Sequence, residues 1–183
     1  ESSINYISSG YYHSAAVDSQ GNVWTWGYNN HGQLGQGSTV DTEIPTKIEN
    51  LTGIEKVASG FYHNLALKSD GTVWSWGYNN QGQLGDGTKV QKTFPVEISG
   101  LSNVEDIAAG NNFSLALKSD GTVWSWGYNN RGQLGINSTT SSSVPVQISG
   151  LSNIVKITAG YYHAMALTST GQVYAWGYNN YGQ

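Results

Sequence analysis

The sequence predicts an all-β fold in which one small unit is repeated, and two observations support this prediction. The pentapeptide Trp-Gly-Tyr-Asn-Asn begins at Trp26, Trp76, Trp126 and Trp176, so it recurs every 50 residues without drift. Within each unit, apolar and polar residues alternate with period two, and glycine interrupts every segment before a helical period is established. We therefore expect a single repeat domain over residues 1–183. Its copies lie at approximately 1–50, 51–100, 101–150 and 151–183, and the last is incomplete.

The second copy illustrates the elements of one unit. A short apolar run at 57–60 predicts a first strand, and alternation over 64–68 predicts a second. Residues 69–71, Ser-Asp-Gly, predict a tight turn because Asp-Gly tolerates positive φ. Alternation over 72–77 predicts a third strand. The segment 94–98 predicts a fourth, and its proline favours an edge position, where a missing N–H does least harm.

The side chains on these strands predict how the units are arranged. Period two places Trp74 and Trp76 on one face of the third strand and Val73 on the other. Alanines on the first two strands predict that these strands crowd toward an axis; they are Ala58, Ala66, Ala108 and Ala116. The tryptophans then lie farther out and dominate the core between units. Four short strands per unit is the size of one blade of a β-propeller.

The repeat resembles a known family. Its pattern is V-x-x-G-x-x-H-x-x-A-L-x-x-D-G-x-V-W-x-W-G-x-N-x-x-G-Q-L-G followed by P-x-x-I, which is similar to the repeat of the regulator of chromosome condensation family. The core Trp-Gly-x-Asn-x-x-Gly-Gln-Leu-Gly stands at 26–35, 76–85 and 126–135. The resemblance covers essentially the whole chain and implies a β-propeller of four-stranded antiparallel blades, usually seven. Family members include exchange factors for small GTPases, ubiquitin-ligase domains, a plant ultraviolet photoreceptor and a bacterial β-lactamase inhibitor, so it implies no single activity.

The number of units predicts how the ring is completed. The chain carries about 3.7 repeats, which leaves unpaired strand edges and an apolar inter-blade face, and both promote association. We expect a homodimer in which a second chain completes a seven- or eight-bladed ring with cyclic symmetry. The alternatives are a fragment of a longer propeller and a closed four-bladed ring.

The loop between the first and second strands is the candidate binding site. Exposed tyrosines offer a large, rigid contact area at low entropic cost, which suits protein recognition. The alternative is that one aromatic residue of each pair packs against the neighbouring blade. The predicted partner-binding residues are Tyr11, Tyr12, Phe61, Tyr62, Asn111, Asn112, Tyr161 and Tyr162.

Two further sets of polar residues recur at equivalent positions. Three of the copies carry histidine, at His13, His63 and His163, and the remaining copy has Phe113. Equivalent atoms of adjacent blades lie too far apart to share a metal ion, so we expect structural histidines bonded between strands or blades. The glutamines of the glycine-rich loop are expected to satisfy loop backbone groups with their amides; they are Gln33, Gln83 and Gln133.

The composition excludes several classes of function. The formal net charge is −4 and the eight basic residues form no run, which argues against nucleic-acid binding. With no cysteine, disulfides and thiolate metal sites are excluded. No apolar stretch approaches the roughly 18 residues of a membrane-spanning helix. Catalytic motifs are missing as well, and Asp70 and Asp120 lie in hairpin turns with a conformational role.

The sequence thus predicts a non-enzymatic propeller scaffold that binds an unidentified protein through one rim and binds itself, without cofactor, nucleic acid or membrane. Alternatives are a lectin-like carbohydrate-binding propeller and an engineered or truncated fragment with no selected ligand. An exchange-factor role has no recognisable site here, and the photoreceptor's Gly-Trp-Arg-His-Thr motif does not occur. The composition, rich in Asn, Gly, Ser and Tyr, resembles that of bacterial extracellular proteins.

Overall fold

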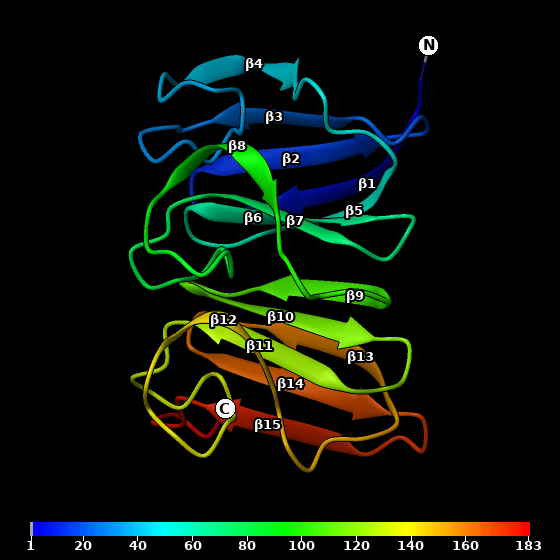
Figure 1. Ribbon diagram of the computed structural model, residues 1–183, viewed down its shortest axis with the longest axis vertical. Coiled ribbons are helices and arrows are strands. Elements are labelled where there is room, and N and C mark those ends of the chain that lie inside the picture. Colours follow the sequence, from blue (N-terminus) through cyan, green and yellow to red (C-terminus); the bar gives the residue numbers. More distant parts are fainter. Residues whose placement is uncertain (1) are drawn as a thin grey trace.

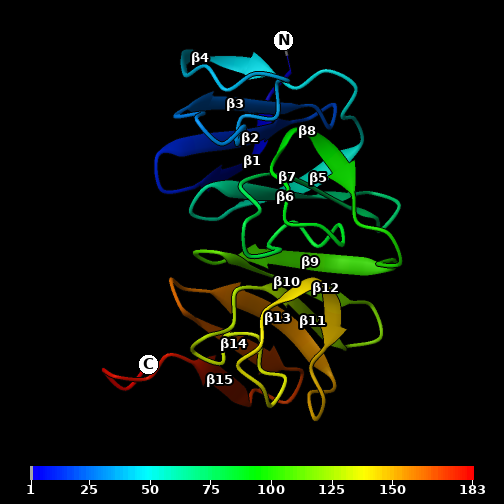
Figure 2. The ribbon, with the colours of Figure 1, turned by 60° about the vertical axis from the view of Figure 1, so that its left-hand side comes forward.

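The computed structural model describes residues 2–183 and contains strands β1 to β15 with no helix among these residues. The strands form four antiparallel sheets that follow one another from the N-terminal sheet to the C-terminal sheet (Figure 1; Figure 2). In each sheet the strands pair in chain order, as in a meander. Each sheet is therefore one blade of the predicted propeller.

The blades have the following strands. Blade 1 contains β1 (Ile4–Ser9), β2 (His13–Asp18), β3 (Val23–Gly27) and β4 (Thr42–Lys47). Blade 2 contains β5 (Ile54–Ser59), β6 (His63–Lys68), β7 (Val73–Gly77) and β8 (Lys92–Glu97). Blade 3 contains β9 (Val104–Ala109), β10 (Phe113–Lys118), β11 (Val123–Gly127) and β12 (Ser142–Gln147). Blade 4 contains β13 (Ile154–Ala159), β14 (His163–Thr168) and β15 (Val173–Gly177).

The first strand of each blade lies nearest the common axis. β1 contacts β5, β5 contacts β9, and β9 contacts β13. Residues of all four strands line one cavity of about 250 Å³. The prediction that the alanine-rich strands lie innermost is confirmed.

The outermost strand tolerates proline because it is an edge strand. β8 pairs only with β7, and its register skips Thr93, Phe94 and Pro95, passing from Val96 opposite Ser75 to Lys92 opposite Gly77. The missing N–H of Pro95 therefore breaks no interior ladder bond. The predicted edge position is confirmed.

The predicted hairpin turn also forms. Gly71 has φ +80°, which glycine adopts without steric cost. The side chain of Asp70 accepts hydrogen bonds from the backbone N–H of Thr72 at 3.0 Å and from its hydroxyl at 2.6 Å. These bonds lower the pKa of the Asp70 carboxyl, since they stabilise its charged form. Asp70 is thus a conformational residue.

Alternation along the third strand separates two inter-blade cores. Trp76 is fully buried in the core shared with blade 1, and Trp74 packs against the same cluster. Val73 belongs instead to the core shared with blade 3. The predicted split of this strand into a tryptophan face and a valine face is confirmed.

A hydrogen bond crosses each of the three junctions between blades, and it is buried at the first two and partly buried at the third. The indole N–H of Trp76 donates to the main-chain carbonyl of Gln33 at 2.9 Å. Trp126 and Trp176 repeat this bond at 2.9 Å to the carbonyls of Gln83 and Gln133. The bond joins residues 43 positions apart and aligns each blade on the one before it.

The two end faces of this four-blade arc are open. Ile7 on blade 1 is 75% exposed, whereas Val57 at the equivalent position of blade 2 is 1% exposed. On blade 4, Val173 is 64% exposed while the equivalent Val73 is completely buried. The four blades therefore do not close on themselves, and both ends present surfaces that are interior elsewhere in the molecule.

The junction hydrogen bond predicts an asymmetry between two neighbouring tryptophans. Trp76→Phe removes the indole donor from the Gln33 carbonyl, which keeps its bond from the Asn64 amide, so the variant loses one buried hydrogen bond, about 0.5–1.5 kcal/mol of unfolding free energy. Trp74→Phe is the matched control, because the Trp74 indole nitrogen is buried without a partner. Urea denaturation measures both, and equal losses in the two variants would contradict the role of the bond.

Candidate binding face

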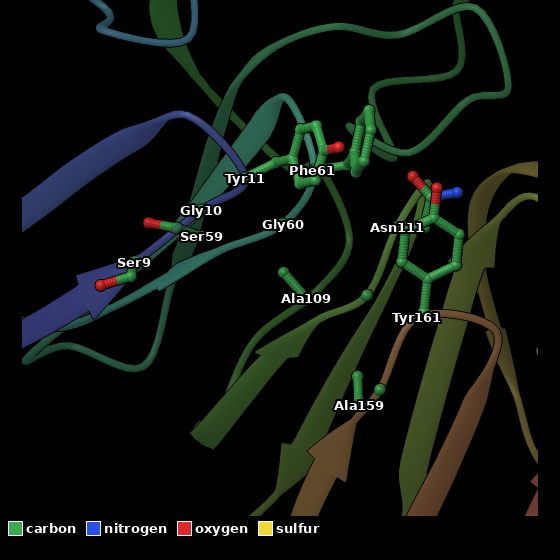
Figure 3. Close-up of a pocket in the computed structure, with 12 residues that line it drawn as sticks. Ser9, Gly10, Tyr11, Ser59, Gly60, Phe61, Ala109, Asn111, Ala159 and Tyr161 are labelled. Atoms are coloured by element: carbon green, nitrogen blue, oxygen red, sulfur yellow. The ribbon is translucent and has the colours of Figure 1, made fainter. Parts of the chain in front are cut away.

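The loops joining the first two strands of every blade meet at one end of the axis. They line an open cavity of about 260 Å³, shown in close-up in Figure 3. No charged side chain lines it. The lining residues are Ser9, Gly10, Tyr11, Ser59, Gly60, Phe61, Ala109, Gly110, Asn111, Ala159, Gly160 and Tyr161.

Aromatic rings of these loops contact one another across the blades. Tyr11 stacks on Phe61 with ring centroids 4.0 Å apart and planes at 18°. In Figure 3 these two rings lie side by side. Phe61 meets Tyr161 edge to face at 5.7 Å, although blade 3 lies between their blades. Aromatic pairs at such separations stabilise each other beyond their buried area.

The backbone explains why these loops approach closely. The N–H of Phe61 donates to the carbonyl of Gly110 at 3.3 Å, and the N–H of Asn111 donates to the carbonyl of Tyr161 at 3.1 Å. A Cβ at Gly10 would lie 2.1 Å from the His13 ring, so a side chain is not tolerated there. Glycine therefore allows the loop to pack on the histidine beneath it.

A second group of aromatic rings extends the cluster away from the axis. His31 lies 5.0 Å from Tyr62 and 4.5 Å from Tyr78, centroid to centroid, and Tyr28 lies 5.5 Å from Tyr62. Tyr12 joins the group through Tyr28 at 6.2 Å. Sequence reasoning did not place His31 among the binding residues. Its only local signal was that position 31 differs in every copy.

We call the Tyr, Phe and His rings of these two groups the aromatic face. Tyr11, Tyr12 and Tyr161 are 51%, 58% and 52% exposed. Phe61 and Tyr62 are half-buried. The aromatic face is thus both packed between blades and accessible to solvent.

Blade 3 interrupts the aromatic face, and one predicted residue is buried there. Asn111 was expected to be an exposed contact, but it is only 6% exposed because its backbone is bonded to the loop of blade 4. The side-chain oxygen of Asn112 accepts a hydrogen bond from Gln83 Nε2 at 2.9 Å. Asn111 therefore offers little surface to a partner.

Three phenols of this face, those of Tyr12, Tyr62 and Tyr161, have a raised pKa. The hydrogen bond to Tyr11 is the main cause that raises the pKa of Tyr12. Burial is the first cause of the raised pKa of Tyr62 and of Tyr161, and neighbouring phenols add to it. These three phenols therefore carry no charge at neutral pH and can act as hydroxyl donors.

The repeated histidines lie inside the blade junctions. His13 Nε2 is 3.0 Å from Asn64 Oδ1 of the next blade, and His63 Nε2 is 3.0 Å from Ser114 Oγ. Burial lowers the pKa of His13 to about 4 and of His63 to about 3. The prediction of structural histidines bonded between blades is confirmed for these two. Among residues 2–183, His, Cys, Asp and Glu form no group that would hold a metal ion.

The glutamines of the glycine-rich loop satisfy backbone groups, as predicted. Gln33 accepts the N–H of His31 at 2.9 Å through its side-chain oxygen. Gln83 and Gln133 do the same for residues 81 and 131 at 2.9 and 2.8 Å. Sequence reasoning missed their second role, because it considered only side-chain amides and not the main-chain carbonyls that receive the indoles.

Antiparallel blades around an axis, each joined to the preceding blade by a tryptophan on its third strand, define a β-propeller repeat protein. The comparisons with known proteins specify the class further. Residues 1–149 match the RCC1-like domain, and residues 154–183 match the regulator of chromosome condensation (RCC1) repeat. The chain belongs to the RCC1-like family.

Solved structures of this class share the fold. Human WBSCR16 is similar with a TM-score of 0.87 and 31% identity, over 96% of this chain and 48% of that one. Yeast RCC1 (Prp20), in its complex with Kap60, is similar with a TM-score of 0.84 and 27% identity, over 95% and 43%. The chain therefore spans less than half the length of these proteins.

Curated relatives match over single repeats. The mitochondrial RCC1 domain-containing protein RUG3 of Arabidopsis thaliana is 46% identical over 48 residues, which are 26% of this chain and 11% of that protein. The ultraviolet-B receptor UVR8 of the same plant is 45% identical over 51 residues, 28% and 12% respectively.

The buried histidines predict a loss of stability in mild acid. Their folded pKa values lie below the unfolded value of about 6.5, so the unfolded state binds protons first as the pH falls. Each histidine removes up to ~1.4 kcal/mol of unfolding free energy per pH unit between about 6.5 and its folded pKa. Urea denaturation at pH 7, 6 and 5 measures this slope.

The chain contains its own control for this prediction. Phe113 and Ala164 occupy the equivalent junction positions in one apolar core. His63→Phe with Ser114→Ala copies that pair and is expected to flatten the slope. Phe113→His with Ala164→Ser copies the polar pair and is expected to steepen it. Unchanged slopes in both variants would show that the junction histidines do not control acid stability.

Proposed function

We propose that this chain is a non-enzymatic scaffold that recognises a protein partner through the aromatic face. The observation behind the proposal is a partly exposed set of aromatic rings, in contact with one another, around a cavity that no charged side chain lines. Tyrosine-rich surfaces of this kind bury a large area on binding at little cost in side-chain entropy. Their phenols and the neighbouring Asn112 can hydrogen-bond to a partner at the edge of the contact.

The packing of the aromatic face supports a preorganised site. Tyr11 and Phe61 stack on each other in the free chain, and the loops that carry them are bonded to neighbouring blades. A partner therefore does not need to order these side chains, which reduces the cost of binding.

The residues that line the cavity between the loops favour a role in binding over a role in catalysis. It consists of glycine, alanine, serine, asparagine and aromatic residues, which suits apolar contact and hydrogen bonding better than proton transfer. The protein partners described for other members of the family are compatible with this proposal. Yeast RCC1 (Prp20) is described bound to Kap60, and Prp20p is described with binding properties to Gsp1p and histones.

A second part of the proposal concerns the ring. We infer that a second chain completes a seven- or eight-bladed ring, because apolar residues such as Ile7 and Val173 are exposed on the open end faces. The aromatic face would then continue from one protomer onto its partner.

Peptide selection tests the aromatic face. Peptides selected from a displayed random library for binding to the chain are expected to lose at least about tenfold in affinity for the Tyr12→Ala/Tyr161→Ala variant, since hot-spot tyrosines carry much of such contacts. Ile44→Ala is the matched control, because Ile44 is 72% exposed on the edge strand β4, outside the aromatic face.

Two results would refute this proposal. Peptides that bind the double variant as tightly as the unchanged chain would place recognition elsewhere. Binding to a glycan array that depends on Tyr12 and Tyr161, with no peptide selected, would assign the face to carbohydrate, whose rings also stack on tyrosine.

Solution mass tests the ring. Light scattering after size exclusion is expected to give about twice the chain mass of 19.7 kDa, because the exposed end faces are apolar. A mass of one chain across the whole concentration range would reject the two-chain ring and leave the test of the aromatic face unaffected.

A further inference from the structure

The internal junctions follow a pairing rule at two positions of the second strand. The first residue on the second strand of one blade faces the second residue on the second strand of the next blade. His13 of blade 1 faces Asn64 of blade 2, and His63 of blade 2 faces Ser114 of blade 3. At the third junction Phe113 and Ala164 lie in one core.

The partners at each junction match in polarity. A buried imidazole N–H needs an acceptor, and Asn64 and Ser114 supply one. Where the ring is Phe113, the facing residue is Ala164, whose side chain has no polar atom that needs a hydrogen bond. Replacing only the histidine of a pair by phenylalanine would bury the hydroxyl or amide oxygen against a phenyl ring. Replacing only its polar partner by alanine would bury an imidazole without a hydrogen bond. The pair therefore specifies which blade faces fit together.

The same second residue also joins the tryptophan bond. The Asn64 amide donates to the Gln33 carbonyl at 2.7 Å, beside the indole of Trp76. The Ser114 hydroxyl donates to the Gln83 carbonyl at 2.8 Å in the same way. A polar junction is therefore one connected network from histidine through hydroxyl or amide to carbonyl and indole.

The open end faces carry the two halves of such a network. The tail face of blade 4 presents His163, the exposed Met165 and Val173, and Gln183 at the position of Gln33. The head face of blade 1 presents Ser14 at the position of Ser114, the exposed Ile4 and Ile7, and a half-buried Trp26 at the position of Trp76.

We propose that the tail face of one protomer binds the head face of a second copy in the register of the internal junctions, so that His163 faces the partner's Ser14. This inference rests on the two-chain ring proposed above and specifies its interface. The pair reproduces His63 with Ser114, and the Gln183 carbonyl receives the indole N–H of the partner's Trp26.

Two consequences follow from this register. The contact is heterologous, because a tail face lacks the indole and the hydroxyl that another tail face would need. It also extends the aromatic face, because Tyr161 of one protomer meets the partner's Tyr11 where Tyr11 meets Phe61 within the chain. A binding face of full circumference thus requires residues of both protomers.

A double-mutant cycle tests the pairing, with the dimer dissociation constant measured by analytical ultracentrifugation. Ser14→Ala alone and His163→Phe alone are each expected to weaken the dimer by about tenfold or more, since each leaves a mismatched junction. The double variant copies Phe113 with Ala164 and is expected to recover most of the affinity. Ser102→Ala is the control, because Ser102 is an exposed serine outside the end faces.

Additive losses in the double variant, or single variants that bind like the unchanged chain, would overturn the pairing. A dimer that shows no coupling between these residues would leave the two-chain ring standing and reject only this interface. An unchanged chain that stays monomeric would reject both.

Mixing tests the direction of the contact. Val173→Asp blocks the tail face and Ile7→Asp blocks the head face, and both residues are exposed in the single chain, so neither change disturbs its core. Each variant alone is expected to be monomeric, whereas the mixture forms a one-to-one complex. Self-association of either variant, or no complex in a mixture at concentrations where the unchanged chain is dimeric, would overturn the head-to-tail arrangement.

Discussion

Each blade junction depends on an indole N–H that donates to a main-chain carbonyl of the preceding blade. Trp76, Trp126 and Trp176 make this bond at the same distance to Gln33, Gln83 and Gln133. A buried carbonyl without a donor is costly, and a large buried ring leaves little freedom in how two sheets pack. The bond and the ring together determine the rotation from one blade to the next.

The aromatic face is a consequence of this rotation. Phe61 is 50 residues from Tyr11 and 100 residues from Tyr161 in sequence, and only the regular advance around the axis brings their rings together. The loops themselves are too short to reach one another by their own flexibility. The scaffold thus positions the binding residues, as expected when a rigid frame carries variable loops.

Near-identical blades raise the problem of specific order. In repeat proteins stability is approximately a sum of units and their interfaces, so identical interfaces would not distinguish one junction from another. This chain varies two facing positions together, His63 with Ser114 and Phe113 with Ala164. The first pair is joined by a hydrogen bond and the second consists of two apolar side chains, so a junction that mixed the two would be unfavourable.

The sequence by itself determined the fold, because its evidence is local and repeated. The constant spacing of Trp26 and its copies, the alternation around Trp74 and the Asp-Gly turn at Asp70 each depend on a few neighbouring residues. Tertiary structure alone decided which atoms meet across a junction, that Asn111 is buried, and that His31 packs between Tyr62 and Tyr78. These contacts join distant residues whose separation is set by blade rotation, and no local periodicity encodes that rotation.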